Sequence, residues 1–353
     1  MTVRSAIMPF PARLRTELKL DPVLMTLVLV LLLGGFVILA SASITISDNA
    51  TGNPFFYLER QLVAAAIGLA AGAFCLFVPM SVWQSLGFLM LLVGLALLCV
   101  VLLPGVGYEV NGATRWVRIG IMNLQVSEPA RLCLFIYLAG YVVRQQKSLR
   151  EEFVGFLRPM LVLSLACALL LAEPDFGAAI VLLATALVML FVAGARIRDF
   201  ILFFSATVIA VVALTLTSPY RVHRLTGFLD PWADPYNSGF QLTQSLIAIG
   251  RGEWLGVGLG DGVQKLFYLP EAHTDFVFAV FAEEFGLLGS VVLIAVFLAL
   301  LWRVFKLAMR AADAERFFEA YLAIGLGTWL GLQAFINVGV NMGLLPTKGL
   351  TLP

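Results

Sequence analysis

Ionisable and amide side chains gather at four places in a chain that is otherwise strongly apolar. The clusters lie at residues 111–118 with 127–131, 173–177, 273–275 with Glu283 and Glu284, and 337–348. A charge at membrane depth is costly, so such residues are functional candidates. Two kinds of chemistry fit them: the gating of a transport pathway, and a reaction on a lipid that carries a polar head group.

Each cluster also has a purely structural interpretation. Asp275 could simply precede a helix, because a carboxylate near a helix N-terminus complements the helix dipole. Glu128 and Arg131 are three residues apart and could pair with each other on one helix face. Glu173 and Asp175 flank a proline at a tight turn, where a structural role is as reasonable as a catalytic one.

Two other features point away from common cofactors, and a third residue, Glu283, has a structural interpretation. His223 and His273 are the only histidines, which makes a zinc site improbable because such sites need three or four ligands. The glycines within 256–262 resemble a phosphate-binding loop, but no strand and helix flank them, so we expect no nucleotide fold. Glu283 lies deeper in its apolar stretch than Asp275 and is better suited to pair with an arginine than to meet a substrate.

The composition decides which elements carry these clusters. Of 353 residues, 61% are hydrophobic and only 13% are charged, against about 25% charged residues in soluble proteins. The 23 Lys and Arg nearly balance the 22 Asp and Glu, so no basic field exists to hold nucleic acid. We predict an all-α polytopic membrane protein with about nine transmembrane helices. These lie near residues 22–43, 57–79, 82–103, 126–143, 156–172, 177–194, 199–217, 274–301 and 318–340.

The positive charges orient the predicted helices. With a cytoplasmic N-terminus, the inside segments hold 14 of the 23 Lys and Arg. The large outer loop is rich in aromatic residues, which argues against disorder, and 240–249 can form a short surface helix with Gln and Ser facing water. The predicted parts are a cytoplasmic tail (1–21), seven helices (22–217), a large extracytoplasmic loop (218–273), two helices (274–340) and an extracytoplasmic C-terminal segment (341–353).

Physical reasoning alone leaves a transporter and a lipid-modifying enzyme open. Transporters are the commoner owners of many spans with buried charges. Against a transporter, the sequence has no clear inverted repeat, and its candidate acids and bases fall at the outer ends of the helices. A large extracytoplasmic loop suits chemistry at the membrane surface better than a binding site at the midplane.

Five sequence runs are specific enough to compare with a known family. They are NGATRWVRIG (111–120), SEPARL (127–132), EPDFG (173–177), the long block 227–286, and NVGVNMGLLPTKGLTLP (337–353). Together they resemble the SEDS family, the shape, elongation, division and sporulation proteins of bacteria. DPWADP (230–235), QLTQSLIAIGRGEW (241–254) and VQKLFYLPEAHTDF (263–276) look more like the division branch of that family than the elongation branch.

The resemblance implies an activity and a place in the cell. The family polymerises lipid II, the undecaprenyl-pyrophosphate-linked disaccharide pentapeptide, into peptidoglycan glycan strands. The acceptor 4-hydroxyl would attack the anomeric carbon of the growing chain, with inversion and release of undecaprenyl pyrophosphate. Such a step requires a base for the hydroxyl proton and cations for the phosphates. The resemblance places the protein in the bacterial inner membrane, at the division septum.

The same resemblance assigns roles to individual residues. Asp275 matches the essential loop aspartate of the family and is our candidate general base. Basic positions of the family motifs fall on the candidates for pyrophosphate contacts, which are Arg115, Arg131 and Lys348. Glu128 and Asp175 would orient those cations or a divalent ion. Further supporting positions are His273 and Thr274.

Cofactors and partners are also implied only by the resemblance. Mg²⁺ or Mn²⁺ could assist the pyrophosphate, although the sequence shows no dedicated metal cage, and no nucleotide or organic cofactor is expected. The expected protein partners are the division transpeptidase FtsI, a class B penicillin-binding protein, and the activators FtsQ, FtsL, FtsB and FtsN. Family members continue beyond the TLP motif with a tenth span, whereas this sequence ends at Pro353.

Two other functions stay open. A lipid II flippase would move the substrate between leaflets without forming glycosidic bonds. A non-catalytic scaffold would position the transpeptidase, and Asp275→Asn would then be silent. Within the family, the elongation branch is the alternative to the division branch.

Overall fold

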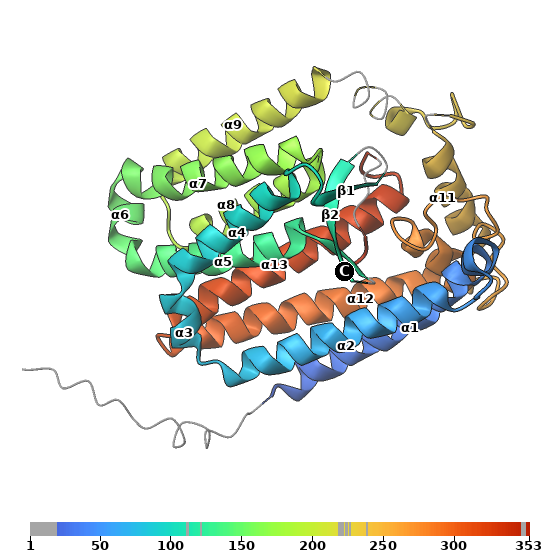
Figure 1. Ribbon diagram of the computed structural model, residues 1–353, viewed down its shortest axis with the longest axis horizontal. Helices are drawn as coiled ribbons and strands as arrows, with labels where there is room; N and C mark the ends of the chain where they lie inside the picture. Colours follow the sequence, from blue (N-terminus) through green and yellow to red (C-terminus); the bar gives the residue numbers. More distant parts are fainter. Residues whose placement is uncertain are drawn as a thin grey trace, which may run out of the picture.

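The computed structural model describes residues 20–110, 113–120, 122–217, 222, 225, 227–237, 239–346 and 351–353. Its helices lie side by side along the long axis of the molecule (Figure 1). The helices are α1 (Pro22–Thr51), α2 (Phe56–Phe77), α3 (Met80–Ser85), α4 (Gly87–Val101), α5 (Ser127–Arg144), α6 (Gln146–Glu151), α7 (Phe153–Ala172), α8 (Phe176–Val192), α9 (Ile197–Leu216), α11 (Phe240–Arg251), α12 (Val277–Asp313) and α13 (Phe317–Asn341). The predicted helical membrane fold is confirmed.

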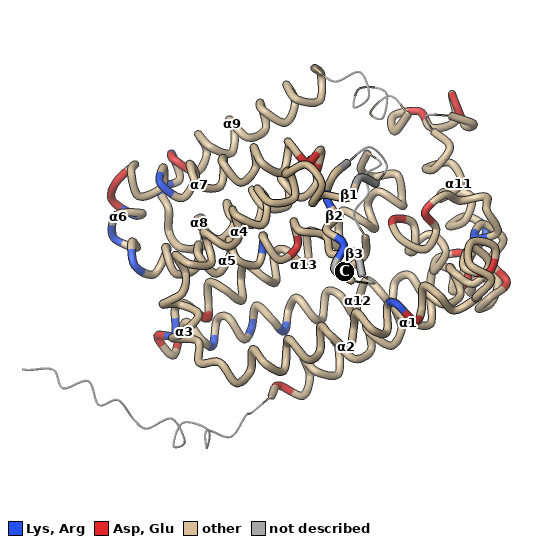
Figure 2. Tube along the Cα trace, in the orientation of Figure 1, with Lys and Arg blue, Asp and Glu red and all other residues tan. Residues whose placement is uncertain are grey.

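Eight of the nine predicted apolar stretches each coincide with one helix, and the ninth, 82–103, covers the end of α3 and all of α4. Among the described residues, 6 helices are long and apolar enough to cross a membrane, and α4 and α8 are shorter apolar helices. α1 continues past the predicted end through a polar stretch to Gly52, whose φ of 70° ends the helix. Figure 2 shows that charged residues gather mainly at the helix ends, as expected if the apolar middles face lipid.

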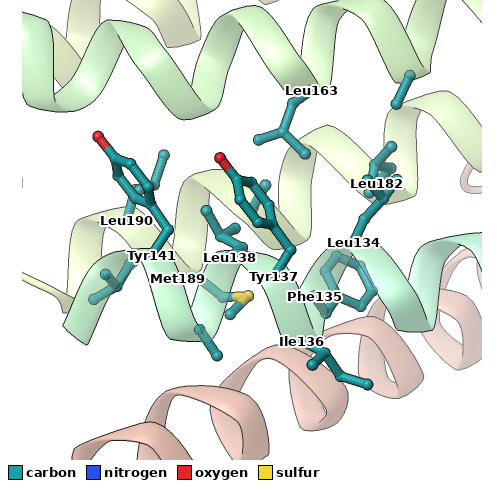
Figure 3. Close-up of a cluster of buried hydrophobic side chains, with 14 of the residues drawn as sticks. Leu134, Phe135, Ile136, Tyr137, Leu138, Tyr141, Leu163, Leu182, Met189 and Leu190 are labelled. Atoms are coloured by element: carbon teal, nitrogen blue, oxygen red, sulfur yellow. The ribbon is translucent and has the colours of Figure 1, made fainter. Parts of the chain in front are cut away.

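The packing differs sharply between inner and outer helices. α5 is the central helix, and its Leu134, Phe135 and Leu138 are fully buried. Figure 3 shows Leu134 beside Leu182 of α8, and the ring of Phe135 lies 5.6 Å from that of Trp329 on α13. By contrast, no residue of α2 is buried. An apolar helix surface that meets no protein is stable in lipid, where the tails supply the apolar surroundings.

A small antiparallel sheet joins α4 to α5 and was not predicted. Its strands β1 (Gly107–Val110), β2 (Ala113–Ile119) and β3 (Met122–Gln125) lie in the order β1-β2-β3. Trp116 of β2 pairs with Gln125 of β3 in the register. The strands are short and contain charged and amide residues among the apolar ones, so they form no long apolar stretch. The sheet places Arg115 next to the start of α5.

α12 is interrupted at Gly286, where φ is 66° and ψ is −165°. In a continuous helix Leu287 N and Leu288 N would donate to Glu283 O and Glu284 O. Here those two carbonyls accept from Val257 N (3.0 Å) and Gly258 N (3.1 Å) instead. Leu287 N and Leu288 N in turn donate to Glu253 O (2.9 Å) and Trp254 O (3.1 Å). The loop between α11 and α12 is therefore inserted into the helix with all four backbone groups paired.

Glycine makes this insertion sterically possible. A Cβ on Gly256 would lie 2.1 Å from Glu284 O, and one on Gly286 would lie 2.4 Å from Gly256 N. The glycine-rich run that resembles a phosphate-binding loop thus packs against a broken helix. Next to it, α11 forms over the predicted surface segment, but the expectation that its serine faces water is wrong. Ser245 is buried, and its hydroxyl is satisfied by donating to Asn341 O (2.8 Å).

Candidate active site

A group of charged side chains surrounds the start of α5; we call Arg115, Glu128, Arg131, Glu173 and Asp175 the arginine cluster. Arg131 is fully buried. Its Nη2 donates to Glu128 Oε1, and its Nε donates to Ser127 O (3.3 Å). Its guanidinium carbon lies 5.1 Å from the ring centre of Trp329 on α13. Nη1 has no hydrogen-bond partner among the described residues, so a buried donor is left for a ligand.

Asp175 connects three elements of the cluster. Its Oδ1 accepts from Ala178 N (3.1 Å) and so caps α8. Its Oδ2 lies 3.3 Å from Ser127 Oγ and 3.4 Å from Gln125 Nε2. Arg115 Nη1 lies 4.0 Å from Oδ1. Asp175 therefore has the structural turn role that the sequence allowed, and it also faces a cation.

Glu173 is the least satisfied member of the cluster. Its side chain is fully buried, and neither carboxyl oxygen has a hydrogen-bond partner among the described residues. Burial, and then the charge of Asp175, raise the pKa of Glu173, Arg115 opposes the rise, and together they give a pKa of about 8. Glu173 is therefore largely protonated at neutral pH and can donate a hydrogen bond.

An apolar cavity of about 560 Å³ lies beside the arginine cluster. Glu128 and Trp329, the two side chains that contact Arg131, both belong to its wall. The rest of the wall is almost entirely apolar and includes Val304 and Leu307 of α12 and Leu326 and Leu330 of α13. Glu128 keeps 34% of its side chain exposed. The cavity suits an apolar chain, and Arg131 is buried behind two of its wall residues, Glu128 and Trp329.

Asp275 lies in a tight turn directly before α12. Glu271 O accepts from Thr274 N (3.1 Å) and Phe276 N (3.2 Å), which closes the turn. Ala272 and Phe276 anchor it in a buried apolar cluster that also contains Ala42, Ala248, Leu269, Ala279 and Val280. Asp275 itself is partly exposed at the surface of the turn. Its carboxylate is thus carried by rigid backbone and can be reached from outside.

Two asparagines of the fourth candidate cluster, to which the sequence analysis gave no individual role, hold this turn. Asn337 Nδ2 donates to Asp275 O (2.9 Å), and Asn341 Nδ2 donates to the same oxygen (3.0 Å). Both asparagines are buried on α13. The available signal was their spacing, because two amides four residues apart share one face of an otherwise apolar helix.

The remaining predicted residues have separate surroundings. The ring of His273 lies 4.7 Å from that of Tyr57, and burial lowers the pKa of His273, which favours the neutral imidazole. Thr274 Oγ1 donates to Glu271 Oε2 (2.6 Å) within the turn. Lys348 lies outside the described residues. Glu283, expected to pair with an arginine, lies 3.6 Å from Arg251 Nη1.

The structure groups the predicted residues into two sites joined by α13. Arg115, Glu128, Arg131 and Asp175 form one, and His273, Thr274 and Asp275 form the other. Trp329 contacts the first and Asn337 contacts the second. Eight residues separate these two contacts, or about 12 Å along a helix. Among the described residues, no group of three or more His, Cys, Asp or Glu could hold a metal ion without help from a ligand.

The fold and the two sites define a class: a multi-pass helical membrane protein with a carboxylate in one site and, in the other, a buried arginine beside an apolar cavity. A family model described as "Cell cycle protein", covering FtsW, RodA and SpoVE, matches residues 22–353. The chain belongs to this family.

Relatives and solved structures agree with this assignment. The chain is 55% identical over 341 residues to "Probable peptidoglycan glycosyltransferase FtsW" of Thioalkalivibrio sulfidiphilus, covering 97% of this chain and 85% of the relative. It is 57% identical over 319 residues to the protein of the same name from Alkalilimnicola ehrlichii, covering 90% and 80%. A structure from work on "polymerization and crosslinking by a peptidoglycan synthase complex" has a TM-score of 0.75 at 31% identity, covering 94% and 90%. The rod-shape-determining protein RodA of Thermus thermophilus has a TM-score of 0.68 at 29% identity, covering 96% and 90%.

Proposed function

We propose that this chain is a peptidoglycan glycosyltransferase that polymerises lipid II at the division septum. The names of its FtsW relatives at more than half identity support the reaction class and the division branch over RodA. The observation that carries the proposal is the pair of sites that α13 joins. One holds the partly exposed Asp275, and the other holds the buried Arg131 beside an apolar cavity.

The reaction is a single inverting displacement. The acceptor 4-hydroxyl oxygen forms a bond to the anomeric carbon of the donor, while the bond from that carbon to the pyrophosphate oxygen breaks. Asp275 takes the hydroxyl proton as general base. The departing pyrophosphate carries the electron pair and is stabilised by Arg115, Arg131 and Lys348. Glu128 and Asp175 orient the two arginines that they face.

A divalent cation fits this site only if the protein and the substrate both supply its ligands. Mg²⁺ is commonly held by one or two carboxylates together with substrate phosphates. Glu128 is the suitable carboxylate, because its side chain remains partly exposed at the cavity wall. A bound Mg²⁺ or Mn²⁺ would neutralise charge on the leaving pyrophosphate.

The proposed setting is the bacterial inner membrane, with the N-terminus in the cytoplasm. The family and the apolar helices make the chain a multi-pass membrane protein. The similarity to a structure from a peptidoglycan synthase complex supports a transpeptidase partner, which in the division branch is FtsI. FtsQ, FtsL, FtsB and FtsN are proposed as activators.

The test is polymerisation of purified lipid II by the chain together with its transpeptidase partner, read as a ladder of glycan products. The native chain should give a ladder, and Asp275→Asn should reduce the rate by at least 100-fold. Ladders of equal intensity from both would move the base elsewhere. Movement of lipid II between leaflets without any ladder would favour the flippase, and a silent Asp275→Asn in dividing cells would favour the scaffold.

A further inference from the structure

The first turn of α12 is opened by a side chain from another helix. In a regular helix Ala279 N would donate to Asp275 O. Instead, Ala279 N lies 3.1 Å from Asn341 Oδ1 and 3.0 Å from Phe276 O. Asp275 O accepts from Asn341 Nδ2 and from Asn337 Nδ2. The amide of Asn341 therefore lies between Ala279 N and Asp275 O, accepting from the first and donating to the second.

Asn341 is itself held firmly enough to act as a support. It is fully buried. Its Nδ2 also donates to Asn337 O (2.8 Å), so both amide hydrogens and the amide oxygen are engaged. Its backbone carbonyl accepts from Ser245 Oγ of α11 (2.8 Å). A buried and fully bonded amide has one low-energy position, and it therefore restricts the positions of the groups that it binds.

The groups that it binds are those that aim the carboxylate of Asp275. The carbonyl carbon of Asp275 is bonded to the same Cα that carries the side chain, so fixing the carbonyl oxygen restricts the direction of the Cα–Cβ bond. Opening the turn also keeps Asp275 outside α12. Inside a helix, its Cβ would point back along the axis and its side chain would lie against the preceding turn.

We propose that Asn341, assisted by Asn337, is a positioning residue for Asp275 in glycosyl transfer. This inference rests on the proposed function, because it assigns a purpose to the geometry around the proposed base. Asn341 acts through the backbone of Asp275 and does not itself contact substrate. The two asparagines contribute unequally. Asn337 donates one hydrogen bond to Asp275 O, whereas Asn341 donates another to the same oxygen and also accepts one from Ala279 N.

The test compares Asn341→Leu and Asn337→Leu with Ser245→Ala in the full chain with its transpeptidase partner. Ser245→Ala is the matched control, because it removes a buried hydrogen bond to Asn341 O but leaves the amide on Asp275. Initial rates across a range of lipid II concentrations separate kcat from KM, and rates are scaled to the amount of folded protein. We expect kcat to fall at least 10-fold in Asn341→Leu and less in Asn337→Leu, with KM changed less than 3-fold. Ser245→Ala should keep kcat within 2-fold.

Hydrogen exchange measured by mass spectrometry gives a second result that does not depend on activity. Peptides from 271–285 should exchange at least 10-fold faster in Asn341→Leu, while peptides from α5 stay unchanged. Native kcat in Asn341→Leu, or an equal loss in Ser245→Ala, would overturn the positioning role. If the native chain forms no glycan, the proposed function fails, and unchanged exchange over 271–285 would separately overturn the inference.

Discussion

Two groups of buried charges in this molecule differ in how completely they are satisfied. The arginine cluster beside α5 leaves Arg131 Nη1, Arg115 Nε and both oxygens of Glu173 without partners among the described residues. A second group, the lysine cluster, consists of Ser41, Arg251, Lys265, Glu283 and Glu284. There Lys265 Nζ donates to Glu284 Oε1 (2.6 Å) and Ser41 Oγ (2.8 Å). Ser41 Oγ also donates to Glu284 Oε1 (2.6 Å).

The lysine cluster uses its charges to hold the loop between α11 and α12. Glu283 Oε1 accepts from Val263 N (3.0 Å), and Oε2 accepts from Gln264 N (3.2 Å). These contacts secure the loop that is inserted into α12 at Gly286. In the lysine cluster Glu284 Oε2 is the one buried side-chain atom without a partner among the described residues, against four in the arginine cluster. Buried polar groups are normally paired, so unused donors next to a cavity indicate a ligand, whereas nearly complete pairing indicates a scaffold. The difference indicates that the arginine cluster is built to bind a ligand, whereas the lysine cluster is built to hold a loop.

The largest expected effect is on stability, in the lysine cluster. Lys265→Met would leave Glu284 as an uncompensated buried charge, and we expect a loss of about 3–5 kcal/mol in the free energy of unfolding. Denaturant or thermal unfolding of the purified chain in detergent measures this loss. Lys147→Met, at an exposed position of α6, is the control and should change stability by less than about 0.5 kcal/mol.

A double variant sharpens the interpretation of that loss. Lys265→Met with Glu284→Gln removes both charges and should recover most of the stability, because the penalty comes from the unpaired carboxylate. A double variant as unstable as the single one would show that the packing of the lysine stem, and not the ion pair, holds the loop.

The sequence could predict the helices but not this distinction. Apolar stretches report where a helix meets lipid or core, so all nine predicted stretches coincide with helices. Lys265 lies in a polar loop, and nothing near it in the sequence shows that its ammonium meets Ser41, which is 224 residues away. The insertion of the loop at Gly286 and of Asn341 at Asp275 likewise depends on contacts between distant segments. Local patterns carry no information on such pairing.

In the arginine cluster the expected effect is on catalysis. Arg131→Lys keeps a positive charge but loses the planar fork of donors that suits a pyrophosphate. We expect a rate of lipid II polymerisation about 100-fold lower, in line with the loss of one aligned donor to a developing charge. The melting temperature should fall less than in Lys265→Met.

The matched control for Arg131→Lys is Arg316→Lys. Arg316 also pairs with a glutamate three residues away, Glu319, but its side chain is 63% exposed. It should keep the native rate and stability, because exposed ion pairs contribute little. A normal rate in Arg131→Lys would mean that the unused Nη1 serves no ligand, and the contrast between the two clusters would lose its functional meaning.

The candidate site was predicted in part, for a physical reason. Glu128, Arg131 and Asp175 are charged residues at helix ends, and this placement is visible in the sequence. Asn337 and Asn341 are neutral amides within a helix, where hydrophobicity does not separate a supporting role from ordinary packing. The strand that carries Arg115 was missed, because its residues give no helical period.

The smallest expected effect concerns the pH dependence of stability at Glu173. Its pKa is about 8 in the folded chain, against 4.5 for a free glutamate. The folded state thus binds the proton more tightly, so stability is fully present below pH 4.5 and is lost as the pH rises through 8. The melting temperature of the native chain should therefore decline by a few degrees between pH 6 and pH 8.5, and Glu173→Gln should remove most of that decline, because glutamine cannot ionise. Glu59→Gln, at an exposed carboxylate of α2, should keep the native slope. Parallel slopes for the native chain and Glu173→Gln would show that Glu173 is ionised at neutral pH, and the arginine cluster would then hold one more charge than its unpaired atoms indicate.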